Sequence, residues 1–100
     1  MGRNIQVAPE QLDSTAVRIE SLAEEYKTQY DKFYTETSAM SSTFSGKAYD
    51  AFITQIDGFK DDFDEMYRLM LAYADFLKKA AKAYRDTQDA AVAQAKKLTN

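Results

Sequence analysis

Five acidic residues in one short stretch are the side chains whose types and spacing most resemble a chemical site: Asp57, Asp61, Asp62, Asp64 and Glu65. On a helix, Asp57 and Asp61 are one turn apart, as are Asp61 and Glu65, and metal sites in helical bundles use such spacings. Those sites also use histidine and point their ligands inward, whereas this chain has no histidine and the cluster lies mostly off the apolar face. We therefore interpret the cluster as a solvated acidic surface and predict no metal site.

The absence of both cysteine and histidine excludes most catalytic chemistry. It removes Ser-His and Cys-His nucleophile systems, the usual zinc spacings and the commonest general base at neutral pH. We predict that the protein is not an enzyme and binds no cofactor.

A net charge of −3 without a basic stripe argues against binding to nucleic acid. The N-terminus lacks the apolar run of a signal peptide and no stretch approaches the ~20 residues of a membrane span, so these rules alone favour a cytosolic protein.

The elements that carry these residues are separated by one strong break, Ser41–Gly46. Serine favours caps and turns over helix interiors, and Gly46 can adopt a positive φ. Phe44 supplies one large apolar side chain beside Ser45 and Gly46, and these three residues form the predicted turn motif. We predict one all-α domain of residues 1–100, an antiparallel helix–turn–helix hairpin. Its parts are helix one at about 9–41, the turn at 42–46, helix two at about 47–88 and a flexible tail at about 89–100.

Apolar residues recur at three- and four-residue steps on both sides of the break, which is typical of one face of a long helix. A hairpin buries only one such interface, and this rarely offsets the entropy lost on ordering the chain. We therefore predict that the hairpin dimerises into a four-helix bundle. A homodimer is favoured. A heterodimer with a related small helical protein or a secreted toxin is the alternative, because the same apolar stripe could pair with any of these partners. The core and dimer stripe comprises Leu12, Ile19, Tyr26, Tyr30, Phe33, Phe52, Ile56, Phe59, Phe63, Met66, Met70, Tyr73 and Leu77.

Segments along most of the chain resemble the motifs of one known family. Residues 5–12 are similar to its usual start, a β-branched residue followed by Pro-Glu and Leu at the opening of the first helix. Phe44-Ser45-Gly46 and residues 48–52 resemble its central turn, in which Trp-x-Gly precedes a small residue and an Ala-Phe pair. Residues 76–84 resemble the close of its second helix. The chain thus resembles the WXG-motif small secreted proteins, the early-secreted-antigen family exported by ESX (type VII) secretion systems.

Two positions depart from this family's pattern. Phe44 replaces the tryptophan, which keeps an aromatic ring at the turn but removes the indole N–H. The family's export signal is Tyr-x-x-x-Asp/Glu, whereas here Tyr84 is followed four residues later by Gln88 and the acid is displaced to Asp89. The resemblance implies that these three residues form an export signal in altered spacing.

The resemblance also implies a function. It is that of a secreted protein made in the cytoplasm and exported as a folded dimer, without a cleaved signal peptide, by a type VII secretion ATPase. Such a protein would act as a virulence- or competition-associated substrate, or as a co-secreted partner. One alternative is a chaperone-like partner that binds the helical N-terminal region of a larger secreted toxin. The other is a helical adaptor that is not secreted.

Overall fold

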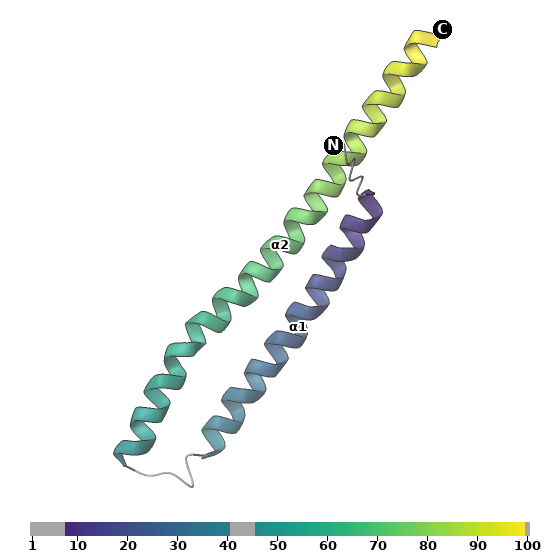
Figure 1. Ribbon diagram of the computed structural model, residues 1–100. Helices are drawn as coiled ribbons and strands as arrows, with labels where there is room; N and C mark the ends of the chain where they lie inside the picture. Colours follow the sequence, from purple (N-terminus) through teal and green to yellow (C-terminus); the bar gives the residue numbers. More distant parts are fainter. Residues whose placement is uncertain (1–7, 41–45, 100) are drawn as a thin grey trace, which may run out of the picture.

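The computed structural model describes residues 8–40 and 46–99, which form two long helices side by side in an antiparallel hairpin (Figure 1). α1 runs Pro9–Ala39 and α2 runs Lys47–Thr99, and the described residues include no strand. The predicted all-α helical hairpin is confirmed. None of the described helices contains a stretch long and apolar enough to cross a membrane.

The start of α1 follows directly from its sequence. Pro9 occupies the first turn, where its missing N–H would have no partner within the helix. Ala8 before it is extended, with φ −67° and ψ 143°, and its N–H donates to the Oε1 atom of Gln11 over 3.1 Å. Glu10 adds a negative charge at the positive end of the helix dipole.

The start of α2 depends on Gly46. Its φ is +75°, a left-handed conformation that residues with a Cβ rarely adopt. In this position its carbonyl accepts the N–H of Asp50 over 3.2 Å, which is the first helical hydrogen bond of α2. Phe44 and Ser45, the other two residues of the predicted turn motif, lie outside the described residues.

The predicted end of helix two at about residue 88 is wrong, because α2 continues to Thr99 and the expected flexible tail at about 89–100 is helical through that residue. The run 90–95 is rich in alanine, which has the highest helix propensity, and Lys96 and Lys97 lie where cations stabilise the negative end of the dipole. α2 is therefore 53 residues long against 31 for α1, and its C-terminal part extends alone beyond the start of α1 (Figure 1).

Small side chains make up much of the buried contact between the helices. The buried residues of α1 recur every seventh position, as in a coiled coil: Pro9, Ala16, Ala23, Tyr30 and Thr37. On α2 the buried residues are Ile56, Ala74, Leu77 and Ala81. The four alanines among these expose none of their surface, so the two backbones can approach closely there.

The predicted stripe is divided by this geometry, because each helix has only one neighbour and cannot bury a wide apolar face. Three classes result. Tyr30, Ile56 and Leu77 are buried; Leu12, Ile19, Tyr26, Phe52, Phe63 and Met70 are half-buried; Phe33, Phe59, Met66 and Tyr73 are exposed.

Candidate functional site

One side of the hairpin carries exposed and half-buried apolar side chains from both helices, and we call it the apolar face. The α1 row follows the buried positions of α1 by three residues, and the α2 row follows Ile56 by three residues and then recurs at every seventh position, which places both rows on the same side of an antiparallel pair. Phe63 joins the rows, since its ring centroid lies 6.3 Å from that of Phe33 and 6.4 Å from that of Phe59. The α1 row is Leu12, Ile19, Tyr26 and Phe33, and the α2 row is Phe59, Met66 and Tyr73.

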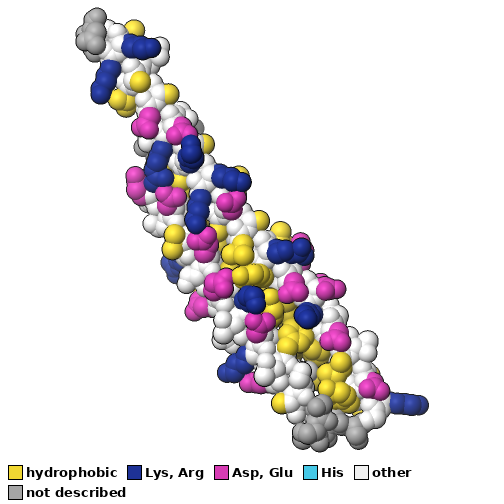
Figure 2. Space-filling view, turned by 180° about the vertical axis from the view of Figure 1, so that it is seen from behind, with side chains coloured by type: hydrophobic (Ala, Val, Ile, Leu, Met, Phe, Trp, Pro, Cys, Tyr) yellow, Lys and Arg dark blue, Asp and Glu magenta, His cyan; other side chains and the backbone are white. Residues whose placement is uncertain are grey.

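Exposure of this face is substantial. Phe59 exposes 44% of its surface, Met66 49% and Tyr73 55%. Phe76 widens the face, because it stacks on Tyr73 with centroids 6.2 Å apart and is itself 61% exposed. Figure 2 shows one side of the molecule, on which hydrophobic side chains form a band toward the turn with charged side chains on both flanks. Apolar surface of this kind suits a protein partner.

An aromatic cluster fills the helix contact nearest the turn. Phe63 lies at its centre and stacks on Tyr30 with ring planes 10° apart and centroids separated by 5.7 Å. The other rings meet Phe63 mostly edge to face, the arrangement that aromatic quadrupoles favour. The members are Tyr26, Tyr30, Phe33, Tyr34, Phe59 and Phe63.

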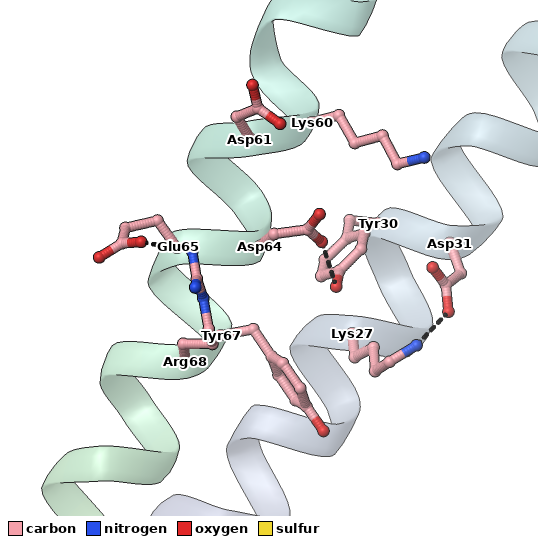
Figure 3. Close-up of a pocket in the computed structure, with 9 residues that line it drawn as sticks. All are labelled: Lys27, Tyr30, Asp31, Lys60, Asp61, Asp64, Glu65, Tyr67 and Arg68. Carbon is pink, nitrogen blue, oxygen red and sulfur yellow. Dashed lines mark hydrogen bonds and ion pairs between the residues drawn. The ribbon is translucent and has the colours of Figure 1, made fainter.

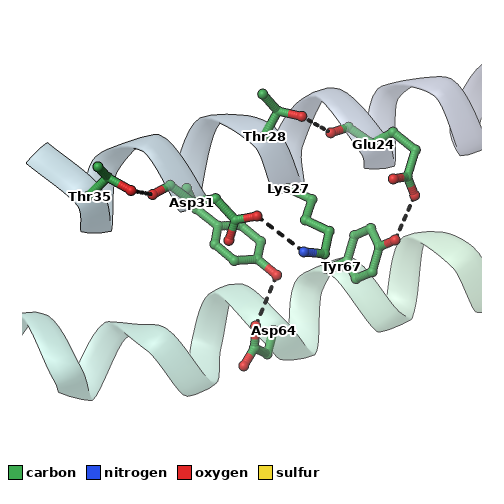
Figure 4. Close-up of polar contacts among 8 residues, drawn as sticks. Glu24, Lys27, Thr28, Asp31, Thr35, Asp64 and Tyr67 are labelled. Atoms are coloured by element: carbon green, nitrogen blue, oxygen red, sulfur yellow. Dashed lines mark hydrogen bonds and ion pairs between the residues drawn. The ribbon is translucent and has the colours of Figure 1, made fainter.

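The opposite side, which we call the polar face, carries hydrogen bonds from tyrosines to carboxylates across the helix pair. Tyr30 Oη donates to Asp64 Oδ1 over 2.9 Å (Figure 3), and Tyr67 Oη donates to Glu24 Oε2 over 2.6 Å (Figure 4). Burial, together with the hydrogen bond to Asp64, raises the pKa of Tyr30 to about 12. The bond to Glu24 is the main cause that raises the pKa of Tyr67. Both phenols are therefore held in the neutral, donating form.

Toward the start of α1, ion pairs continue the polar face. Lys78 Nζ lies 2.7 Å from Glu20 Oε2, and Arg85 lies 2.7 Å from Asp13 Oδ2. The bond to Glu20 raises the pKa of Lys78. These partly exposed pairs are worth little in energy, but they fix which residues of the two helices lie opposite each other.

The acidic cluster of α2 is divided between the helix contact and the solvent (Figure 3). Asp64 is half-buried and accepts the bond from Tyr30, whereas Glu65 pairs with Arg68 within α2 over 2.7 Å. Asp57, Asp61 and Asp62 are exposed. In the part of the chain that the structure describes, no three acidic side chains are grouped as a metal ion requires. The sequence interpretation missed the role of Asp64, although its position directly after Phe63 places it beside α1.

The residues of the predicted export signal lie near and beyond the start of α1, since Arg85, the neighbour of Tyr84, still pairs with Asp13 of α1. Tyr84 is 38% exposed, and Gln88 and Asp89 are also exposed. Tyr84 and Gln88 line a shallow groove with Ala80, Ala83, Thr87 and Ala91, whereas Asp89 does not line it. The altered spacing thus places the amide of Gln88, rather than a carboxylate, beside the tyrosine.

Fold and surface together define a small helical hairpin with an exposed apolar face. The sequence matches the WXG100 family, described as proteins of 100 residues with WXG, over residues 4–89, and the chain belongs to this family. The family resemblance found in the sequence is confirmed. The chain has no tryptophan, so Phe44-Ser45-Gly46 stands in place of the motif that gives the family its name.

Solved structures share this fold. A mutant of the secreted protein EsxB from Bacillus anthracis str. Sterne is 20% identical, with a TM-score of 0.75 over 90% of this chain and 99% of that chain. EsxA from Geobacillus thermodenitrificans is 19% identical, with a TM-score of 0.78 over the same shares of both chains. A comparison with curated proteins gave no significant match.

Proposed function

We propose that this protein is a substrate of a type VII secretion system, exported as a folded helical homodimer without a cleaved signal peptide. Membership of the WXG100 family supports the secretion route. The structural neighbour EsxB, which is described as a secreted protein, gives further support. The apolar face is the single observation that carries the proposal, because it leaves a folded chain with a surface that needs a partner.

A second copy of the chain fits this face. Two hairpins that pair through the same surface form a closed four-helix bundle, in which the rows of Phe33 and Phe59 become core. The polar face stays in solvent in this arrangement, so its ion pairs and tyrosine bonds remain within each hairpin. The bundle is then the exported body, with its solubility provided by the charged outer surface.

The C-terminal part of α2 carries the export signal in this proposal. Tyr84, Gln88 and Asp89 are exposed on α2 near and beyond the start of α1, so a secretion ATPase can contact them without opening the bundle. Changing Tyr84→Ala should lower the secreted fraction in a bacterium with an active type VII system, while Tyr84→Phe should be milder. Equal export of both variants and the unchanged chain would show that Tyr84 is not part of the export signal.

Light scattering of the purified chain at micromolar concentration tests the dimer. We expect a mass near twice 11.4 kDa, and Phe59→Glu should reduce it to one chain because it places a charge in the bundle core. Thr54→Glu is the matched control, since Thr54 is exposed and lies about 200° around α2 from the buried Ile56. A monomer before any substitution would contradict the homodimer.

A heteromeric role remains the second candidate, favoured by the same exposed apolar face. A chaperone-like subunit would cover the face with the helical N-terminal region of a larger toxin rather than with its own copy. Co-purification with such a helical partner, combined with a monomeric mass for the isolated chain, would support this role over the self-paired dimer.

A further inference from the structure

The two rows of the apolar face have their centres at nearly the same height of the hairpin. Met40 continues the α1 row by one further step of seven residues, which makes that row symmetric about Tyr26. The α2 row is symmetric about its middle member, Met66. Tyr67, the next residue, donates its hydroxyl to Glu24 of α1, so the two centres lie close to one level. A two-fold axis at this level, perpendicular to the helices, therefore places each row opposite its own copy.

The charge along α2 favours the antiparallel orientation that such an axis produces. Residues 47–66 contain six acids and two bases, whereas residues 67–99 contain three acids and seven bases. When two copies of α2 run antiparallel about Met66, the acidic half of each lies along the basic half of the other. A parallel pair of α2 helices would place like charges together instead. A second copy of this chain thus complements the charge of the first.

An apolar pocket of about 210 Å³ lies beside the α1 row. A cavity of about 150 Å³ admits a benzene ring, so this pocket has room for one aliphatic side chain. Leu22 lies seven residues before Gln29, one of the lining residues, and is therefore on the same flank of α1. It exposes 47% of its surface. The pocket is lined by Tyr26, Gln29, Tyr30, Phe33 and Phe63.

We propose that Leu22 of each copy fills this pocket of the other copy, in an antiparallel dimer whose two-fold axis passes Tyr26. A residue four positions before the axis lies opposite the residue four positions after it, so Leu22 reaches the level of Tyr30, midway along the pocket. By the same rule Ile19 meets Phe33. This arrangement rests on the homodimer proposed above and specifies which side chains join its two copies.

The exchange of Leu22 buries apolar surface on both copies. Leu22 loses its remaining contact with water, and Phe33, which is 40% exposed, is covered. Leu22→Ala removes two such contacts from each dimer, so its dissociation constant should rise about 100-fold, tenfold for each contact. Light scattering over a dilution series measures this change. Val17→Ala is the matched control and should leave the constant unaltered, since Val17 is 58% exposed but lies about 140° around α1 from Leu22.

Substituted cysteines test the register, because the chain itself contains none. In the proposed dimer Leu22 of one copy lies beside Gln29 of the other, so mixed Leu22→Cys and Gln29→Cys chains should form a disulfide with each other on mild oxidation. Neither variant should cross-link alone, since two copies of Leu22 lie ~12 Å apart along the helix and two of Gln29 ~9 Å, beyond the ~7 Å that a disulfide spans. Mass spectrometry distinguishes the three possible products.

The outcomes separate this register from the homodimer itself. A dimer of the unchanged chain whose variants give no mixed disulfide, or cross-link equally well through Leu22→Cys alone, overturns the register and leaves the homodimer intact. Equal dissociation constants for Leu22→Ala and Val17→Ala likewise overturn it. A monomeric unchanged chain refutes the homodimer and, with it, the exchange of Leu22.

Discussion

Near the start of α1 the two helices meet through alanines, whereas near the turn they meet through aromatic rings. Ala16, Ala23, Ala74 and Ala81 expose none of their surface, and ion pairs flank them. In the other half Phe63 packs among five rings, and tyrosine hydroxyls donate to Asp64 and Glu24.

The difference shows that close approach and buried area are separate contributions. An alanine buries little apolar surface, but it allows the backbones to meet and excludes any larger side chain. An aromatic residue buries far more area and tolerates a wider separation. We therefore expect most of the burial energy to lie in the turn-proximal half and the strictest steric limits in the alanine half.

The change Phe63→Ala should have the largest effect, because it removes the ring that contacts all other members of the aromatic cluster. We expect the free energy of unfolding to fall by about 3 kcal/mol in urea titrations followed by circular dichroism. Leu98→Ala is the control, since Leu98 is 82% exposed, and it should change stability by less than about 0.5 kcal/mol. Similar losses in both variants would refute the role assigned to the cluster.

The change Ala74→Leu tests the alanine half from the opposite direction, by adding volume. We expect a loss of about 2 kcal/mol, since the added atoms must push the helices apart. Ala72→Leu places the same side chain at an exposed position two residues away and should be nearly neutral. If Ala74→Leu is tolerated as well as Ala72→Leu, the close packing proposed for the alanine half does not limit the size of its side chains.

The change Tyr30→Phe addresses the polar contact of the aromatic half. At neutral pH it should cost about 1 kcal/mol, the usual value of one hydrogen bond. In the unchanged protein the pKa of Tyr30 is raised from 10.0 to about 12, so its contribution is complete below pH 10 and is lost as the pH rises toward 12. Melting curves between pH 8 and pH 12 should therefore decline less steeply for Tyr30→Phe. Tyr73→Phe, at a 55% exposed position, should keep the steeper decline.

The smallest effect is expected for Asp13→Asn, which breaks an ion pair of the alanine half. Both partners are 41% exposed in their side chains, so the loss should be about 0.5 kcal/mol and should disappear in high salt. Asp86→Asn breaks a pair within α2 with Lys82 and provides the comparison for a bond that does not join the helices. A loss above about 2 kcal/mol for Asp13→Asn would show that this half depends on charge rather than on close packing.

The sequence alone predicted the hairpin and its family, because helix-period apolar residues, the start at Pro9 and the break before Gly46 are all local signals. The depth of burial at each position was not predictable in the same way. Ala74 and Phe59 both lie near the stripe, but only the packing of one helix against one neighbour leaves Phe59 exposed and buries Ala74 completely. Nor was the position of Asp64 beside Tyr30 apparent, since the pairing of residues 34 positions apart depends on the register of the hairpin.

The length of the hairpin affects how the protein moves in solution. Its radius of gyration is 23.1 Å and its extents are 82 × 28 × 16 Å, whereas a compact domain of the same chain length has a radius of gyration of about 13 Å. A rod meets more drag than a sphere of equal mass, so a single chain will diffuse slowly and leave a gel-filtration column early. Calibration against globular standards would therefore overstate its mass, and one hairpin could be mistaken for two.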